Sequence, residues 1–184
     1  MKKYLLVTAL LFATFFNAQE KEIYPQDIDK KHEIKANVFS LIALSSFDVS
    51  YEYLLSKDSS FGVSLFINTT NKGDDLYFPK KFSLTPYYRW FFTDVKFARG
   101  FFVEGFGSVN TYENDFFSIN SSNSEIKSST DFALGVSVGG KFVIKSGFTA
   151  EIYLGVGRNL FYDSDNSNEF NIITRGGLSL GYRF

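Results

Sequence analysis

Apolar and polar residues alternate over most of this chain. Residues 60–69 show the pattern, since Phe61, Val63, Leu65 and Ile67 are separated by small or polar residues. A strand places every second side chain on one face, whereas an amphipathic helix repeats its apolar positions every 3.6 residues, which these segments do not. The alternation predicts eight strands, at residues 34–44, 46–55, 60–69, 81–92, 101–112, 130–144, 147–160 and 170–184.

The predicted strands have the length of membrane-spanning β-strands. Such a strand needs about 9–11 residues with every second side chain facing lipid. Lipid offers no hydrogen-bond partner to an open sheet edge, so strands cross a membrane only as a closed barrel. We therefore predict an all-β fold, an eight-stranded antiparallel transmembrane β-barrel that is formed by residues 34–184 and surrounded by the lipid of a bacterial outer membrane.

The connections between the strands fit the same architecture, in which short periplasmic turns alternate with longer external loops. With the N-terminus in the periplasm, the predicted turns are residues 56–59, 93–100 and 145–147. The predicted external loops, rich in Asn, Ser, Asp and Gly, are residues 70–80, 113–129 and 161–169. The first external connection, near Ser45, is much shorter than the others.

Two of the predicted strands contain an irregularity. In the first strand the apolar face changes sides, which predicts a bulge near residues 38–40. In the fourth, Pro86 removes a backbone donor from a strand that is paired on both sides, and we predict a second bulge there.

Aromatic residues, 19% of the chain, gather at the ends of the predicted strands. One set falls at the periplasmic ends: Tyr53, Phe61, Trp90, Phe92, Phe101, Phe102, Phe142, Phe148, Tyr182 and Phe184. A second set falls at the external ends: Phe78, Phe82, Tyr112, Phe116, Phe132, Phe161 and Phe170. Because aromatic side chains prefer membrane–water interfaces, the two sets predict two girdles. The alternative, that aromatic residues simply favour strands, explains their number but not their positions.

The N-terminal residues have the features of a secretory signal peptide. Lys2 and Lys3 precede an apolar run at residues 4–16, and small and polar residues follow it. This run is shorter than the ~20 residues of a membrane-spanning helix. We predict a cleaved signal peptide at residues 1–18 and a periplasmic lead-in at residues 19–33, followed by the barrel.

Charged residues on the polar faces of the predicted strands would point into the barrel: Lys35, Asp48, Glu52, Arg89, Glu104, Lys141, Glu151, Arg175 and Arg183. The interior of an eight-stranded barrel is just wide enough for side chains to fill it. Opposite charges must pair there, because an unpaired buried charge has a large desolvation cost. We predict a packed polar lumen in which these charges have a structural role. A path for protons or ions is the alternative interpretation.

Composition excludes several kinds of protein and site. With 19 basic and 20 acidic residues, the chain has no positive field that would hold nucleic acid. The absence of cysteine excludes a lipoprotein anchor and disulfides. The one histidine, His32, precedes the first predicted strand, far from an external rim where a catalytic hydroxyl would need a base. No metal-ligand spacing is recognisable, so we predict no enzyme activity, no metal and no cofactor.

Three segments resemble those of small outer-membrane β-barrel proteins of the Bacteroidetes type: residues 50–53 (SYEY), 85–92 (TPYYRWFF) and 176–184 (GGLSLGYRF). The resemblance implies a barrel similar in size and topology to OmpA-type and OmpX-type barrels, and implies no particular activity. The last strand alternates and stops on an aromatic residue. We expect it to be read by the outer-membrane barrel assembly machinery through Leu178, Leu180, Tyr182 and Phe184.

The function that these features predict is a non-enzymatic structural or surface-interaction role in the outer membrane. Residues 113–129 would carry any binding, because Phe116, Phe117 and Ile119 form an apolar group within a polar loop. The sequence identifies no protein or ligand partner. Two alternatives stay open: a soluble lipocalin-like carrier with its apolar face inward, and a narrow channel for ions or small solutes.

Overall fold

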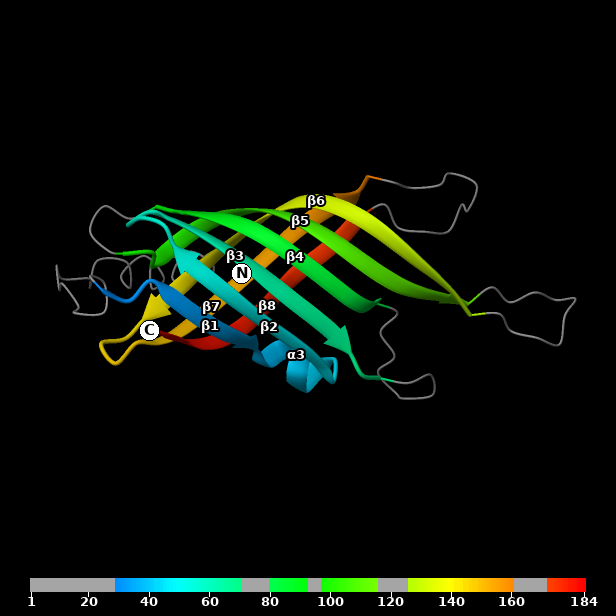
Figure 1. Ribbon diagram of the computed structural model, residues 1–184, viewed down its shortest axis with the longest axis horizontal. Helices are drawn as coiled ribbons and strands as arrows, with labels where there is room; N and C mark the ends of the chain where they lie inside the picture. Colours follow the sequence, from blue (N-terminus) through cyan, green and yellow to red (C-terminus); the bar gives the residue numbers. More distant parts are fainter. Residues whose placement is uncertain (1–28, 71–79, 93–96, 116–125, 161–171) are drawn as a thin grey trace, which may run out of the picture.

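The computed structural model describes residues 29–70, 80–92, 97–115, 126–160 and 172–184. They form a closed antiparallel barrel in which each strand pairs with the next and β8 pairs with β1 (Figure 1). The elements are β1 His32–Asn37, α3 Val38–Ala43, β2 Ser46–Leu54, β3 Ser59–Asn68, β4 Lys80–Phe91, β5 Gly100–Asp115, β6 Ile126–Val143, β7 Phe148–Asn159 and β8 Ile172–Arg183. The predicted all-β, eight-stranded barrel is confirmed.

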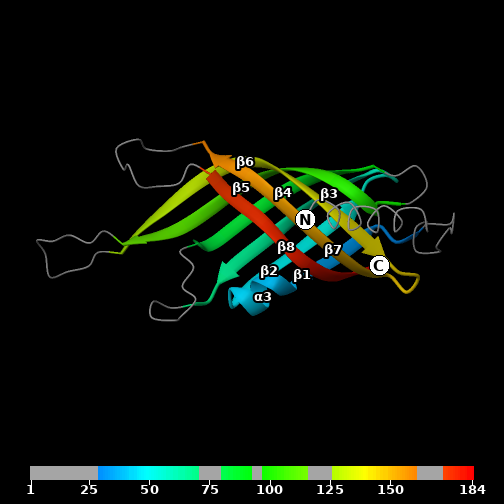
Figure 2. The same cartoon turned by 180° about the vertical axis from the view of Figure 1, so that it is seen from behind.

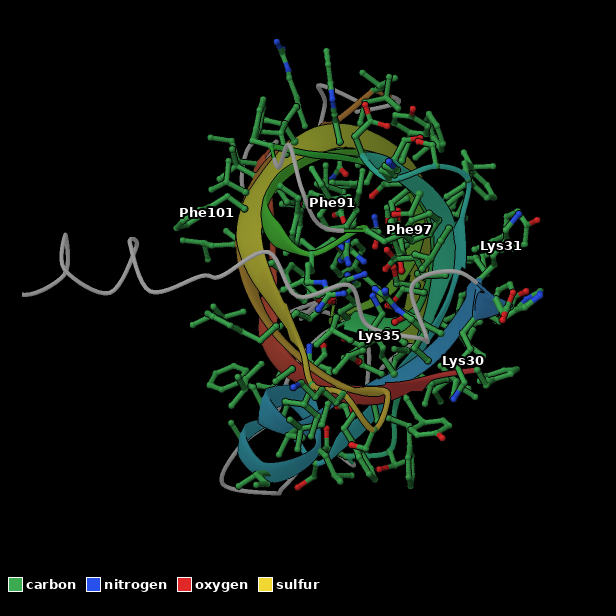
Figure 3. The ribbon with its side chains drawn as sticks, turned by 90° about the vertical axis from the view of Figure 1, so that its left-hand side faces the viewer. Lys30, Lys31, Lys35, Phe91, Phe97 and Phe101 are labelled. Atoms are coloured by element: carbon green, nitrogen blue, oxygen red, sulfur yellow. The ribbon has the colours of Figure 1, made fainter. Side chains whose placement is uncertain are left out.

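Side chains on each strand alternate between the outside and the inside of the barrel. On β4, Trp90 points outward with 59% of its surface exposed, whereas its neighbour Arg89 is buried inside. Seen along the barrel, nitrogen and oxygen atoms gather within the ring of strands, while Phe101 and other carbon-only side chains surround it (Figure 3). The lipocalin-like alternative required the apolar rows to face inward, so its predicted orientation is wrong.

The first strand ends earlier than the alternation predicts. β1 stops at Asn37, and the residues expected to continue it with a bulge form the helix α3 instead. The Asn37 side chain caps this helix by accepting a hydrogen bond from the Ser40 backbone N–H at 3.3 Å. Ser40 faces inward, whereas Phe39 and Ile42 are exposed on the outer side. Among the described residues, no helix is long and apolar enough to cross a membrane.

Helix α3 takes the place of the missing half of β1 in the barrel wall. β8 begins at Ile172 and pairs with β1 only from Ser179 to Arg183. Helix α3 also contacts β8. Figures 1 and 2 show α3 next to β2 and β8. The Asn37 amide joins the two sides, donating to the Gly176 carbonyl at 3.3 Å and to Asp48 at 2.8 Å. This amide therefore binds a backbone acceptor in the part of β8 that β1 does not pair with.

The bulge in β4 lies elsewhere than at Pro86. On both sides of this proline the register with β5 is the same, since Leu84 pairs with Val109 and Tyr87 pairs with Phe106. The register shifts instead between Lys80 and Phe82. A bulge changes which face the following side chain points to. The Lys80 ammonium accordingly lies inside the barrel, over the ring of Phe66.

Two boundaries differ from the prediction. β5 and β6 extend to Asp115 and Ile126, so the connection between them is shorter than the predicted loop 113–129. The candidate contacts Phe116, Phe117 and Ile119 lie outside the described residues, as do the predicted signal peptide and the girdle residues Phe78, Phe161 and Phe170. β1 begins at His32, so Glu33 belongs to the barrel and not to a lead-in.

Most described members of the predicted girdle at the turn end lie on the outside. Trp90 stacks on Phe92 with 6.1 Å between ring centroids, and Phe148 meets Tyr182 edge-on at 5.3 Å. The assignment of Phe102 to this girdle is wrong. Its side chain points inward and packs on Phe91 at 5.5 Å, because it has the same parity as the lumenal residues of β5.

Candidate functional site in the barrel lumen

The structure brings the charged residues of the polar strand faces together inside the barrel. Of the nine that the sequence singles out, these are buried: Lys35, Glu52, Arg89, Glu104, Lys141, Glu151 and Arg183. Asp48 and Arg175 also point inward, toward a small cavity. Some partners lie on neighbouring strands, as Arg89 and Glu104 do. Others lie across the barrel, as Lys141 and Glu52 do, and these contacts could not be predicted from the strand order.

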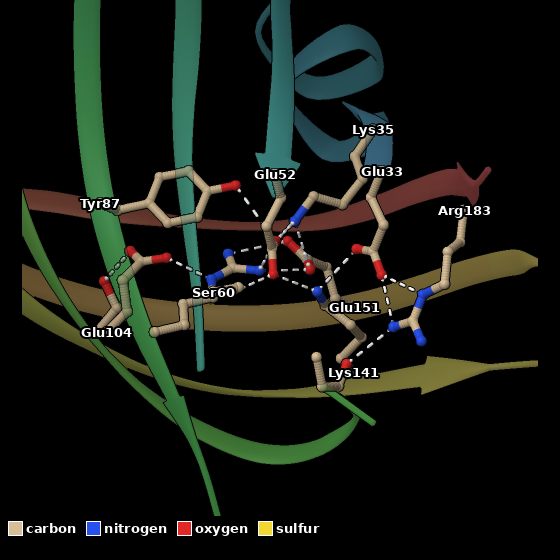
Figure 4. Close-up of polar contacts among 12 residues, drawn as sticks. Glu33, Lys35, Glu52, Ser60, Tyr87, Glu104, Lys141, Glu151 and Arg183 are labelled. Atoms are coloured by element: carbon tan, nitrogen blue, oxygen red, sulfur yellow. Dashed lines mark hydrogen bonds and ion pairs between the residues drawn. The ribbon is translucent and has the colours of Figure 1, made fainter. Parts of the chain in front are cut away.

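Figure 4 shows Glu52, Glu104 and Glu151 among the polar contacts of the lumen. Arg89 is buried there and contacts all three carboxylates. Its Nε donates to Glu104 at 2.7 Å, and its Nη1 donates to Glu52 at 2.8 Å and to Glu151 at 2.7 Å. A second bond joins its Nη2 to Glu151 at 3.1 Å. The guanidinium can bind these carboxylates together because its donors project from one plane in fixed directions.

Two lysines complete the charge around these carboxylates. Lys35 donates to Glu52 and, at 2.9 Å, to Glu151. Lys141 donates to Glu52 at 2.6 Å and to Glu33 at 2.8 Å. Glu52 therefore faces three cations and has the hydroxyl of Ser60 as a further donor at 2.6 Å.

Glu33 also belongs to these buried charged groups, although it is not among the nine residues that the sequence singles out. It is fully buried and lies between Lys141 and Arg183, with 2.6 Å from its Oε1 to the Arg183 Nη2. Arg183 also donates to the backbone carbonyls of Phe97 and Ala98, both at 3.0 Å, and so holds the β4–β5 connection against the mouth of the barrel. Glu33 has the same parity as Lys35, and that signal could have found it.

We call these side chains the ion-pair cluster: Glu33, Lys35, Glu52, Arg89, Glu104, Lys141, Glu151, Arg175 and Arg183. Burying so many charges is tolerated only when each ion meets opposite charge and its remaining lone pairs are satisfied. Ser137, for example, donates to Glu104 at 3.0 Å. The cluster closes the lumen at this level with polar groups that are nearly inaccessible to water.

Aromatic rings pack against the cluster inside the barrel, and the alternation of apolar and polar residues does not predict them there. The Arg89 guanidinium lies over Tyr87 and Phe102, 4.6 and 4.3 Å from the ring centroids. Phe102 also belongs to an apolar group with Leu54 and Phe91. Stacking on aromatic faces stabilises a desolvated guanidinium and limits the directions in which it can move.

The carboxylates of the cluster and the one histidine are engaged in contacts with other side chains. Within the described ranges, no three His, Asp or Glu side chains are placed to hold a metal ion. His32 lies at the turn end, where its Nδ1 is 2.6 Å from the Tyr51 hydroxyl and its ring stacks on Phe184. Each carboxylate of the cluster already accepts from at least two donors, which makes it a poor proton acceptor for a substrate.

The residues of the predicted assembly signal are exposed on the outer face of β8: Leu178, Leu180, Tyr182 and Phe184. Their alternation with Ser179 and Arg183, which point inward, matches the sequence pattern. Recognition of this strand by an assembly machinery stays a prediction.

A family model describing proteins of unknown function matches residues 5–184, which is nearly the whole chain. The chain belongs to the DUF3575 family. No curated protein matches its sequence.

Among solved structures, this DUF3575 protein is similar to the N-terminal β-barrel domain of Pseudomonas aeruginosa OprF. The two share 18% sequence identity with a TM-score of 0.53, and the match covers 85% of this chain and 100% of the other. At this identity the similarity supports the fold alone. The eight-stranded barrel fold is thus supported, whereas the resemblance to outer-membrane barrels of the Bacteroidetes type stays a prediction.

Proposed function

We propose that this protein is an integral outer-membrane barrel with a closed lumen and a non-enzymatic, structural or surface-interaction role. The observation that carries the proposal is the distribution of side chains, apolar on the outside and charged on the inside. In water this arrangement would expose the apolar rows and bury the charges, the opposite of what stabilises a soluble protein. In a membrane the apolar side chains would contact lipid, while the charged side chains stay enclosed in the lumen.

The outer apolar surface has the limits of a membrane-spanning band. On β7 the outward row runs from Phe148 to Val156 and then reaches the charged residue Arg158. At the same end of the barrel, Thr111 on β5 and Thr130 on β6 form a polar pair, with 3.2 Å between their hydroxyls. The β7 row covers about 26 Å at roughly 3.3 Å per residue. A tilt of ~40° reduces this to about 20 Å, near the ~25 Å expected of such a band.

The packing of the lumen supports a role without conduction or catalysis. Arg89, Lys35 and Lys141 tie carboxylates from several strands into one buried cluster. A hydrated ion would have to break these pairs to pass. We propose that the external loops carry the surface-interaction role, with Phe116, Phe117 and Ile119 as the contacts. We also infer that the C-terminal strand is the part that the barrel assembly machinery reads.

Solubility and conductance together test this proposal. The chain from Gln19 onward, refolded and purified, should stay monodisperse only in detergent, because its apolar exterior aggregates in water. Its folded state should migrate faster than the heated sample on a gel. Inserted into a planar bilayer, it should give no discrete current steps. Monodisperse behaviour in plain buffer would contradict the membrane assignment, and regular current steps would replace the closed lumen with a channel.

A further inference from the structure

Next to the ion-pair cluster, the lumen contains a small cavity of about 80 Å³, lined by polar and apolar side chains, at the end that leads to the predicted external loops. Its walls include Ser40 on α3 and Asp48 on β2, together with these residues of β4, β5 and β8: Lys80, Ser108 and Arg175. We propose that this cavity binds one small inorganic oxyanion, such as phosphate or sulfate. This site is additional to the structural role proposed above.

Lys80 supplies the first cation. The bulge between Lys80 and Phe82 turns its side chain into the lumen, where a regular strand would have pointed it outward. Within the described part of the chain, its ammonium lies over the Phe66 ring, 5.4 Å from the centroid, and forms no hydrogen bond or ion pair. None of the described residues accepts from its three ammonium donors, which can therefore serve an anion in the cavity.

Arg175 supplies the second cation. Among the described residues, its guanidinium donates only to Glu104, through Nη1, although it carries five N–H donors. Its side chain is 12% exposed, and it lines the cavity. The rings of Tyr87 and Tyr153, 5.1 and 5.0 Å from the guanidinium carbon, hold it in place. The unused donors are thus fixed in position before a ligand arrives, which lowers the entropic cost of binding.

Hydroxyl groups form another wall of the cavity. Ser83, Thr85 and Ser108 lie 2.8–3.1 Å from one another and share hydrogen bonds in which either partner can donate. Hydroxyl hydrogens rotate, so the group can present a donor to an oxyanion without moving its oxygen atoms.

The carboxylate of Asp48 keeps its negative charge and attracts Lys80 through space, but its lone pairs are directed to donors on its own side of the cavity. It accepts from Asn37 and Ser64, both at 2.8 Å, and from Ser40 at 3.4 Å.

The charge balance also favours an anion. The cluster and the cavity together contain six cations, Lys35, Lys80, Arg89, Lys141, Arg175 and Arg183. They contain five carboxylates, Glu33, Asp48, Glu52, Glu104 and Glu151. Among these described side chains one positive charge is left over, and a buried unbalanced charge is costly. An oxyanion between Lys80 and Arg175 would balance it through charge-assisted hydrogen bonds.

Calorimetric titration of the refolded chain in a phosphate-free maltoside detergent tests the site, with inorganic phosphate and then sulfate as probes. We expect saturable binding of one anion per chain. Lys80→Gln should weaken it at least about tenfold, the effect of losing one hydrogen bond to a charged group. The matched control is Lys81→Gln, since the neighbouring lysine instead donates to the Thr70 carbonyl at 2.8 Å. That variant should bind as the wild type does.

Heat-dependent gel mobility confirms that both variants are folded, which is expected because Lys80 lies outside the ion-pair cluster. Absence of saturable binding to the wild type would overturn the proposal. Equal weakening by Lys80→Gln and Lys81→Gln would also overturn it, since binding would then reflect general surface charge. A parallel titration uses short-chain phosphatidic acid. Binding of this lipid without binding of inorganic phosphate would assign the site to a lipid headgroup and contradict a free oxyanion.

Discussion

Replacing Arg89 with alanine should lower the free energy of unfolding by about 3–5 kcal/mol, the range for removing one partner of a buried ion pair. The substitution leaves Glu52, Glu104 and Glu151 close together in a dry lumen without the guanidinium that contacts all three. It also removes the group that packs on Tyr87 and Phe102. The loss should appear as a lower urea midpoint for unfolding in detergent or lipid vesicles.

Arg158→Ala is the matched control for this substitution. It removes the same side chain from an exposed position on the outside of β7 and should change stability by less than about 0.5 kcal/mol. Arg89→Lys keeps one charge but cannot reach three carboxylates, so its stability should lie between those of the alanine variant and the wild type. Equal midpoints for Arg89→Ala and Arg158→Ala would show that the cluster does not stabilise the barrel.

Gly139→Ala should destabilise the barrel by about 1–3 kcal/mol or more through overpacking. Gly139 faces the lumen, where a Cβ atom would lie 2.6 Å from the Ile152 carbonyl oxygen and 2.8 Å from the Tyr153 Cβ. It would also lie 2.5 Å from the ring of Phe102. Two of these neighbours belong to the adjacent strand β7, so the wall itself would have to move.

The adjacent residue provides the control for the glycine substitution. A Cβ atom on Gly140 points outward and meets nothing within 4 Å. Gly140→Ala should therefore be neutral or stabilising by up to about 1 kcal/mol, since alanine restricts the unfolded chain. Urea midpoints of the two variants, measured side by side, give the comparison. If both variants matched the wild type, β6 and β7 would not approach as closely as described.

The sequence predicts most of the fold because seven strands keep the two-residue repeat over their length. The prediction of the first strand is wrong beyond Asn37, because the two-residue repeat is lost at Val38. The capping side chain of Asn37 then favours a helical turn. A proline removes a ladder donor and so predicts a bulge at Pro86, yet the register there is undisturbed. The real shift, near Lys80, has no proline or glycine to mark it.

The members of the site were more predictable than their partners. Parity alone places residues such as Arg89 and Glu151 inside, whatever the exact register. The predicted first strand begins at residue 34 and therefore excludes Glu33, whereas β1 begins at His32. Phe102 is assigned to the girdle by its position at a strand end, although its parity places it inside, and no prediction covers the orientation of Tyr87. Pairs such as Arg89 and Glu104 follow from the register of neighbouring strands. Pairs such as Lys141 and Glu52 depend on distances across the barrel, about which a single sequence contains no information.

Trp90, the only tryptophan of the chain, allows the most direct test of the central claim, that the apolar exterior faces acyl chains. Its ring is exposed on the outside near the turn end of β4. In vesicles whose lipids carry bromine at chosen acyl positions, its fluorescence should be quenched, most strongly by bromines close to the headgroups. Absence of quenching at every bromine depth, together with full quenching by aqueous iodide, would contradict the account.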